Sequence, residues 1–389
     1  MFSNSTNDLG ICCNTWPKDA HGLFDYESET INTMEKTLGK GGKITRDSEL
    51  NETQYYPTKQ DDGFFLTGAT ISPCTPPPDA LAFFYSDSTS LIKLSKNIDN
   101  QYIYNKENIM KVQEKFWYVL AQMETKGIRK EYLSNYKYSF GLNDIVRFGR
   151  VQFVVRQINE GNNLNKNDTL PLFLPNETPV EGNDKPCSIC QKSDGDTNKL
   201  TNPVVKICQC KESPYMHVEC FKNFLKTSKS FAYKDAQFAN KKVTLIKLYN
   251  FICSNCNEPY NAILKKNGRE YNILPYENPG GEVPHLVLES LNFVKEGIFI
   301  ALIMIFIFPK KKEEYYLGRG HEATFKVSDI SISRVHCKIY MQNNKILLDD
   351  LGSKFGTLVL MRNKDLEVEE MLEKKIKIQT VRSVFWIKQ

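Results

Sequence analysis

Seven cysteines and one histidine between residues 187 and 256 have the spacing of metal ligands. They fall into four close pairs: Cys187 and Cys190, Cys208 and Cys210, His217 and Cys220, and Cys253 and Cys256. Eight nitrogen and sulfur ligands in four pairs are what two tetrahedral zinc ions require. Buried structural cysteines are the alternative, but they would not explain why seven of the eleven cysteines lie in this window. The spacing therefore predicts two bound Zn²⁺ ions.

The order of these ligands resembles the RING-CH variant of the RING finger, the zinc module of a class of ubiquitin ligases. A single residue separates Cys208 from Cys210, and the fifth ligand is His217; both features are typical of that variant. The run at 221–225, after the sixth ligand, and Pro259-Tyr260, after the eighth, are also similar to the family. The resemblance covers about residues 185–262.

The PHD finger, a module that binds histone tails, has the same order of ligands. It usually has a wider gap between the third and fourth ligands, and an aromatic residue two positions before the seventh. Phe251 meets the second condition, but the single residue between Cys208 and Cys210 fails the first. We therefore prefer the RING-CH interpretation.

The RING-CH resemblance implies an interleaved cross-brace, in which the first and third pairs share one zinc and the second and fourth share the other. It also implies that the module binds a ubiquitin-charged E2 enzyme and orients its thioester, so that no side chain acts as a nucleophile. In the family, the E2 groove uses positions that are Ile189 and Phe224 here. Ser254 replaces a frequent proline and Asn257 a basic residue, so two positions depart from the family pattern.

Three short motifs near the end of the chain suit the binding of a phosphate. They are Gly318-Arg319, the Ser333-Arg334-Val-His336 run, and the Gly352-Ser-Lys354-Phe355-Gly356-Thr run. In order and spacing they resemble the motifs of FHA domains, the β-sandwiches that bind phosphothreonine. This resemblance covers about residues 286–389, and the alternating pattern between the motifs is that of a sandwich.

A phosphate dianion requires guanidinium groups and neutral hydroxyl or backbone donors. The FHA resemblance implies that Arg319, Ser333 and Arg334 line the phosphate pocket, and that Lys354 lies on the loop that holds the peptide. We expect His336 to brace these loops. Phe355 stands where most FHA domains have an asparagine that holds the peptide backbone, which leaves the peptide preference open. A basic loop cluster on an inert sandwich is the alternative.

The sequence predicts a multidomain protein, in which a small zinc-stabilised RING-CH module and an all-β FHA sandwich follow a β-rich N-terminal domain. The predicted divisions are a mostly disordered tail at 1–78, a β-rich domain at 79–157, linkers at 158–184 and 263–285, the zinc module at 185–262 and the FHA domain at 286–389. The hairpin pattern at 141–155 resembles the closing strands of an FHA domain, and the pattern at 376–387 is similar, which makes a degenerate FHA-like sandwich one interpretation of residues 79–157. An unrelated β-rich domain at 79–157 is the alternative.

Two other stretches carry structural expectations. The segment between Cys220 and Cys253, rich in lysine and aromatic residues, is expected to form a helix and a loop. Residues 297–308 form the most apolar run, which is shorter than the roughly 20 residues that a membrane span needs. We expect a core strand or strand pair there, with membrane insertion as the alternative.

Together these features predict a RING-type E3 ubiquitin ligase with an E2 enzyme and phosphothreonine proteins as partners. The balance of 51 basic and 46 acidic residues does not suggest a nucleic-acid binder. Zinc-type cysteine spacing and an N-terminus without an apolar signal segment favour the cytoplasm or nucleus. A non-catalytic phosphopeptide-binding adaptor with a structural zinc module and a membrane-attached ligase are the alternatives.

Overall fold

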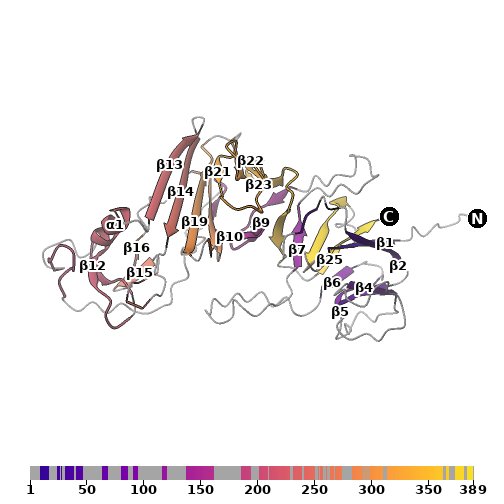
Figure 1. Cartoon of the computed structure of the whole chain (residues 1–389), viewed down its shortest axis with the longest axis horizontal. Coiled ribbons are helices and arrows are strands. Elements are labelled where there is room, and N and C mark those ends of the chain that lie inside the picture. The colour runs from indigo at the N-terminus through magenta and orange to yellow at the C-terminus, as the bar shows by residue number, and fades with distance from the viewer. Residues whose placement is uncertain are drawn as a thin grey trace, which may run out of the picture.

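The structure is a computed structural model. It describes residues 9–16, 24–26, 28, 31–38, 41–46, 64–68, 80–85, 91–94, 116–120, 137–161, 185–193, 201–208, 210–227, 231–238, 241–249, 253, 255–256, 260, 263–266, 268–273, 283–291, 294–295, 298–309, 313–361, 365–367, 373–380 and 383–388. Figure 1 shows these elements as an elongated body, with the cysteine-rich module at one end and the N-terminal strands at the other.

A long antiparallel sheet runs through the body. In spatial order its strands are β13 (Phe231–Phe238), β14 (Lys241–Tyr249), β19 (Ile298–Ile307), β17 (His285–Leu291), β10 (Val151–Asn159), β9 (Ile145–Phe148), β24 (Thr357–Leu360), β7 (Phe116–Val119), β26 (Lys377–Thr380), β27 (Ser383–Lys388), β1 (Leu9–Thr15) and β2 (Asn32–Leu38), and β18 (Val294–Lys295) pairs with β19. Neighbours in space are often distant in sequence, so this sheet holds the whole chain together (Figure 1).

A second sheet covers the middle of the long one. Its order is β21 (Phe325–Lys326), β20 (Glu314–Gly318), β22 (Cys337–Gln342), β23 (Lys345–Asp350) and β8 (Tyr138–Ser139). Leu317, Ile339 and Leu348 of this sheet share a core with Phe153 and Val359 of the long sheet. Inward apolar residues alternate with outward ones along β23, as expected for a sandwich.

The hairpin that completes the sandwich is formed by β9 and β10, which come from an unexpected part of the chain and are called the upstream hairpin below. β9 pairs with β24 and β10 pairs with β17, so the upstream hairpin lies inside the long sheet. β26 and β27 instead lie beyond β7 and pair with β7 and β1. The prediction of a separate domain at 79–157 therefore differs from the structure. Both hairpins have the apolar pattern of a closing strand pair, and the sequence pattern cannot tell which sheet position each one takes.

The N-terminal region also differs from the predicted disordered tail. β1 pairs with β27, and the side chains of Cys12, Cys13 and Trp16 are buried. Trp16 packs in a core with Leu358 and Leu360 of β24, on the face of the long sheet opposite the sandwich. A few buried residues thus order a segment whose polar composition suggested disorder.

A third sheet is formed by strands from both ends of the chain. Its order is β25 (Asp365–Glu367), β6 (Leu91–Leu94), β5 (Ala80–Tyr85), β3 (Gly41–Arg46) and β4 (Phe64–Gly68). Three of these strands fall within the predicted tail or at its boundary. Most of the predicted linker at 158–184 lies outside the described residues.

The cysteine-rich module contains a two-stranded sheet, one helix and a hairpin. These are β11 (Val204–Lys206) with β12 (Tyr215–His217), α1 (Val218–Thr227), and β15 (Ile263–Lys266) with β16 (Arg269–Asn272). The β15–β16 hairpin lies in the predicted linker at 263–285. After α1, the segment expected to be a loop forms β13 and β14, because alternating apolar residues such as Ile246 and Leu248 face a core.

The most apolar run of the chain is β19, in agreement with the expected core strand. It lies between β14 and β17. Met304 and Phe306 face the sandwich core, whereas Ile303 and Ile305 face a second core beneath the cysteine-rich module. A strand that is buried on both faces is apolar throughout rather than alternating. In the part of the chain that the structure describes, no helix has the length and hydrophobicity that a bilayer span requires.

Candidate metal centre and phosphopeptide loops

The eight cysteine and histidine side chains gather into two groups of four that could each hold a metal ion. The groups are Cys187, Cys190, His217 and Cys220, and Cys208, Cys210, Cys253 and Cys256. Within each group, the ligand atoms lie within 4.8 Å of one another. The first ligand pair is grouped with the third and the second with the fourth, which is the composition that the interleaved pairing implies.

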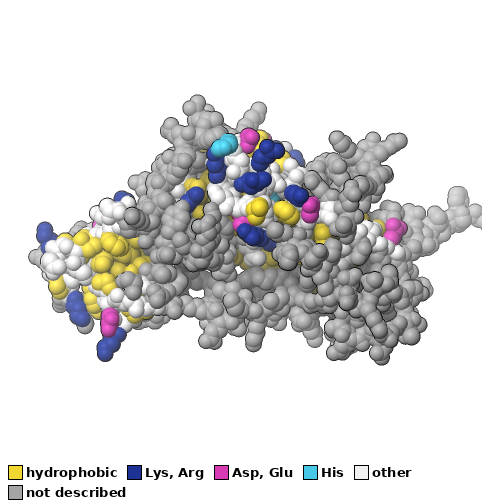
Figure 2. Space-filling view, in the orientation of Figure 1, with side chains coloured by type: hydrophobic (Ala, Val, Ile, Leu, Met, Phe, Trp, Pro, Cys, Tyr) yellow, Lys and Arg dark blue, Asp and Glu magenta, His cyan; other side chains and the backbone are white. Residues whose placement is uncertain are grey.

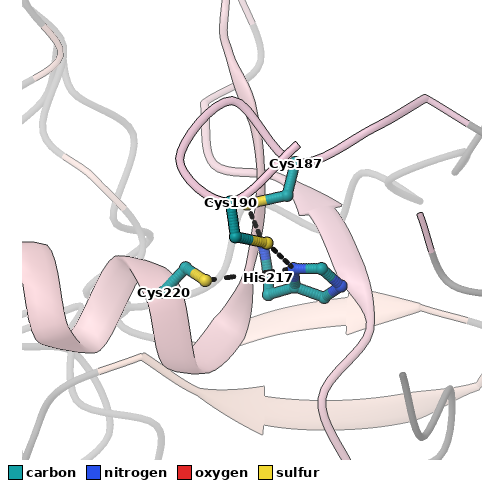
Figure 3. A group of neighbouring side chains, drawn as sticks. All are labelled: Cys187, Cys190, His217 and Cys220. Carbon is teal, nitrogen blue, oxygen red and sulfur yellow. Dashed lines mark hydrogen bonds between the residues drawn. The ribbon is translucent and has the colours of Figure 1, made fainter. Parts of the chain in front are cut away.

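Local structure positions the first group (Figure 3). Cys187 and Cys190 lie on a tight turn, in which the Gln191 backbone N–H donates to the Cys187 carbonyl at 2.9 Å. His217 ends β12, and Cys220 lies in the first turn of α1. The Nδ1 atom of His217 is 3.3 Å from Cys190 Sγ and 3.9 Å from Cys220 Sγ. Four donors of this kind suit a tetrahedral ion.

The second group is built on another small turn. The Cys208 backbone N–H donates to Ser213 Oγ at 2.9 Å, and the Ser213 N–H donates to the Cys210 carbonyl at 3.1 Å. Cys208 Sγ lies 3.4 Å from Cys256 Sγ, and Cys210 Sγ lies 3.8 Å from Cys253 Sγ. This group has sulfur donors alone, so it favours a soft or borderline metal ion.

The electrostatic surroundings favour the thiolate at one cysteine of each group and the neutral thiol at another, since burial raises the pKa of Cys208 and of Cys220 to about 12. Burial raises the pKa of Cys187, but backbone N–H groups, including that of Cys190, outweigh it and lower this pKa to about 6. Burial also raises the pKa of Cys253, but backbone hydrogen bonds from Asn255 and Cys256 outweigh it and lower this pKa to about 7. Thiolates are the metal-binding form of cysteine.

The metal module is fixed to the long sheet through a shared core. Phe221 and Leu225 of α1 are buried in the same cluster as Ile246 of β14 and Ile305 of β19. Ile189 and Phe224, the predicted E2 contacts, lie instead at the surface, with 46% and 48% of their side chains exposed. Ser254 and Asn257 lie outside the described residues.

The predicted phosphate-binding residues come together on loops at one end of the sandwich. The Arg319 N–H donates to the Ser333 carbonyl at 3.0 Å, and the Gly320 N–H donates to the Arg334 carbonyl at 2.9 Å. The Arg319 and Arg334 side chains are exposed. Gly318 is required for this approach, since a Cβ atom there would lie 2.1 Å from the Arg334 carbonyl oxygen.

Ser333 and His336 connect this loop to the next one. Ser333 Oγ accepts a hydrogen bond from the Lys354 backbone N–H at 3.1 Å. The buried His336 ring accepts from the Ser333 N–H at Nδ1 and donates from Nε2 to the Gly356 carbonyl at 3.2 Å. Burial lowers the pKa of His336, so its neutral form braces the loops as expected.

Comparison with known protein families matches an FHA domain over residues 315–378. The chain contains an FHA domain. The comparison confirms the motif-based prediction over this segment, and an FHA domain implies phosphothreonine-containing proteins as partners. Searches of the curated proteins and of the solved structures give no match.

Asp350 shapes the third loop of the FHA domain, a role that the sequence analysis missed. Its Oδ1 atom accepts the backbone N–H groups of Gly352 and Ser353, and its Oδ2 atom accepts the hydroxyls of Ser353 and Thr357. An aspartate two residues before a glycine is a recognised turn signal, so the pattern was available in the sequence.

The N-terminal segment packs on the same loop of the FHA domain. The Tyr26 N–H donates to the Lys354 carbonyl at 3.0 Å, and Asp25 pairs with the Lys354 ammonium at 3.1 Å. The ammonium also lies 5.7 Å from the centre of the Phe355 ring. Lys354 is therefore exposed at the edge of the predicted pocket but is held by neighbours that the sequence did not indicate.

Proposed function

We propose that the protein is a RING-type E3 ubiquitin ligase that recruits phosphothreonine-containing proteins through its FHA domain. In this proposal, the cysteine-rich module binds a ubiquitin-charged E2 enzyme and accelerates transfer by orienting the thioester. The observation that carries the proposal is a pair of exposed apolar side chains beside the first group of candidate metal ligands.

This pair supports E2 binding by its position. Ile189 immediately precedes Cys190, and Phe224 lies one helical turn after Cys220 on α1, so both residues flank the same four ligands. Large hydrophobic side chains with this exposure are uncommon in the described parts of the chain, where Ile330 and Leu351 are the other examples. Figure 2 shows hydrophobic atoms gathered at this end of the molecule, near α1 and β12. Exposed apolar patches often mark binding surfaces.

We further propose that both ions are Zn²⁺. One group offers three sulfurs and a nitrogen and the other four sulfurs, donor sets typical of closed structural zinc sites. The metal would fix the turn that presents Ile189 against the helix that presents Phe224. Sites of this kind need reduced cysteines, which supports a place in the cytoplasm or nucleus.

The FHA loops support the recruiting role. Arg319 and Arg334 are exposed cations on adjacent loops, and the Arg319 backbone N–H donates to the carbonyl of Ser333, the residue before Arg334. Two guanidinium groups and nearby hydroxyl and backbone donors suit a phosphate dianion. A phosphothreonine on a target protein would bind there while the metal module holds the E2 enzyme.

Autoubiquitination of the full chain with a panel of E2 enzymes tests the enzymatic proposal. We expect ubiquitin conjugates with the wild type, and loss of about tenfold or more in rate for Ile189→Ala and Phe224→Ala, because hot-spot residues dominate such interfaces. Leu351→Ala is the control, since it removes an exposed apolar side chain on the FHA loops. Absence of conjugates with every E2, from protein that holds two zinc ions, would refute the ligase proposal.

Phosphopeptide binding is tested separately. Full-chain protein should bind a pool of phosphothreonine peptides but not their unphosphorylated forms, and Arg334→Ala should weaken binding by about tenfold or more. Lys345→Ala, a charge removal on the β22–β23 turn, is the control. Equal binding of both peptide forms would refute this half of the proposal.

A non-catalytic adaptor is the second candidate function. The departures at Ser254 and Asn257 favour it, because these positions contact E2 or ubiquitin in the family that the module resembles. The adaptor predicts phosphopeptide binding that depends on Arg334, together with zinc binding, and no ubiquitin transfer with any E2.

A further inference from the structure

A turn outside the FHA match is built into the ligand-binding loops. It is Gly149-Arg150, between β9 and β10 of the upstream hairpin. The Gly149 N–H donates to the Gly356 carbonyl at 3.1 Å. Gly149 has a φ of +58°, and a Cβ atom there would lie 2.4 Å from the Ser331 carbonyl oxygen. The turn is thus closely fitted between two loops of the FHA domain.

The residue before this turn is also tied to the same loops. Phe148 is fully buried at the end of β9, and its ring packs edge-on against His336 at a centroid distance of 5.8 Å. His336 in turn braces Ser333 and Gly356. The upstream hairpin therefore fixes the position of Arg150 relative to the phosphate loops.

Two hydrogen bonds fix the position of Arg150 and orient its side chain. The Arg150 backbone N–H donates to Ser331 Oγ at 3.0 Å, and the side-chain Nε–H donates to Asp329 Oδ2 at 2.9 Å. The Asp329 side chain is only 5% exposed, whereas that of Arg150 is 57% exposed. Guanidinium has five N–H donors in a fixed plane. A buried carboxylate therefore holds one edge of the group while much of it faces solvent.

The oriented guanidinium extends the basic surface of the FHA domain. Arg150 is anchored through Ser331, and Ser333, two residues later, anchors Lys354 in the same way, through a backbone N–H donated to a serine hydroxyl. Ile330 lies between Asp329 and Ser331 and is 73% exposed. Figure 2 shows Lys and Arg side chains gathered around hydrophobic atoms on this face. A peptide bound at Arg334 would pass over a surface that is both basic and apolar.

We propose that Arg150 is a ligand-contacting residue that recognises a second anionic group in the phosphothreonine peptide. The group is a carboxylate or a second phosphate, since both accept paired hydrogen bonds from guanidinium. This inference rests on the proposed phosphopeptide binding of the FHA domain. It makes the upstream hairpin a determinant of peptide specificity, although it lies outside the segment that matches the family.

A positional scan with the full-chain protein tests the proposal. Phosphothreonine peptides carry Ala, Asp or phosphoserine at each flanking position in turn, and affinities are measured by fluorescence anisotropy for the wild type, Arg150→Gln and Lys345→Gln. Lys345 is a matched control, because it is 60% exposed and pairs with Glu160 at 2.8 Å, much as Arg150 pairs with Asp329. Wild type and Lys345→Gln should prefer an anionic residue over Ala by about tenfold at one position or more.

In Arg150→Gln the preference should fall below about twofold, while the all-Ala phosphothreonine peptide binds as before. If Asp and phosphoserine raise the affinity of the wild type equally, the group that contacts Arg150 is assigned as a single carboxylate. If phosphoserine raises the affinity more than Asp does, that group is assigned as a second phosphate. An unchanged preference, no anionic preference in the wild type, or an equal loss for all peptides would overturn the proposal. Failure of the wild type to bind any phosphothreonine peptide would instead refute the proposed function of the FHA domain, and this inference with it.

Discussion

At the scale of single residues, the phosphate loops depend on small polar groups that determine where the cations lie. Ser331 and Ser333 each accept a backbone N–H, and so fix Arg150 and Lys354 against the loop that carries Arg334. The buried acids Asp329 and Asp350 satisfy the backbone and hydroxyl donors of two loops. The cations thus carry the proposed contacts with ligand, while neutral and buried acidic groups hold them in place.

Lys377 offers a test of electrostatics at one residue. Burial, with a smaller contribution from Lys375, lowers the pKa of Lys377 to about 8. Because a pKa unit corresponds to about 1.4 kcal/mol, keeping this lysine charged in the folded state costs on the order of 3 kcal/mol at pH 7. We expect Lys377→Met to raise the free energy of unfolding at neutral pH.

The gain should be largest below pH 8 and should shrink as the pH rises toward about 10.5, because the folded wild type then loses the proton that is costly to bury. Urea unfolding at pH 7 and pH 10 measures the difference. Lys374→Met, at an exposed neighbouring position, should change stability little at either pH. A gain for Lys377→Met that did not depend on pH would contradict this explanation.

At the scale of elements, the third FHA loop combines a left-handed glycine with a close contact. Gly356 has a φ of +75°, and a Cβ atom there would lie 2.4 Å from the Tyr26 ring. Gly352 has a φ of +73°, but its Cβ position has no neighbour within 4 Å. Gly352→Ala should therefore cost about 1 kcal/mol of stability through backbone strain, and Gly356→Ala clearly more. Denaturant unfolding of the two variants isolates the contact with Tyr26, and equal costs would show that this contact is unimportant.

The placement of the upstream strands can be tested through a buried ion pair. Arg156 of β10 donates to Glu289 of β17 at 2.5 Å, and both side chains are almost fully buried. Arg156→Met leaves a buried carboxylate without this partner and should cost about 3–5 kcal/mol, whereas adding Glu289→Leu should recover most of the loss. A double-mutant cycle by thermal unfolding measures the coupling. Additive costs would show that the two side chains do not interact and would contradict the contact between β10 and β17 that rests on this pair.

The position of the upstream hairpin, β9 and β10, in the long sheet marks the limit of prediction from sequence. Metal-ligand groups and phosphate loops could be predicted, because their chemistry depends on short spacings such as Cys187 to Cys190 and Ser333 to His336. The place of 145–159 in the sheet could not, since pairing between distant strands depends on contacts that no local pattern encodes. The Gly149-Arg150 pair is visible in the sequence, but no Ser-x-x-His run follows it, so the sequence alone does not assign Arg150 to phosphopeptide binding.

At the scale of the whole molecule, the metal module and the FHA sandwich share one sheet. β14 pairs with β19, and β19 pairs with β17, so hydrogen bonds between strands connect the metal module to the sandwich. The two proposed binding surfaces therefore have a defined relative position. A bound target would be presented to the E2 enzyme from a fixed direction.

Metal removal should affect the metal module but leave phosphothreonine peptide binding by the FHA domain almost unchanged. Chelation should release two zinc ions per chain, unfold the turns that carry Cys187 and Cys208, and loosen α1, since metal binding and folding are coupled in such modules. Phosphothreonine peptide affinity should change by less than about twofold, because the FHA loops contain no metal ligand in the described residues. Metal analysis, circular dichroism and peptide titration of one sample provide the check. Parallel loss of peptide binding would show that the sandwich itself depends on metal.

The role proposed for the metal module is to position a charged E2 enzyme for ubiquitin transfer. Single-turnover discharge of a preformed E2–ubiquitin thioester onto free lysine measures this step without a substrate protein. The wild type should accelerate discharge by about tenfold or more, and chelation or Ile189→Ala should remove the acceleration while Leu351→Ala should not. Discharge at the unassisted rate with every E2 tested, by protein holding two zinc ions, would contradict this proposed role and leave a phosphopeptide-binding adaptor.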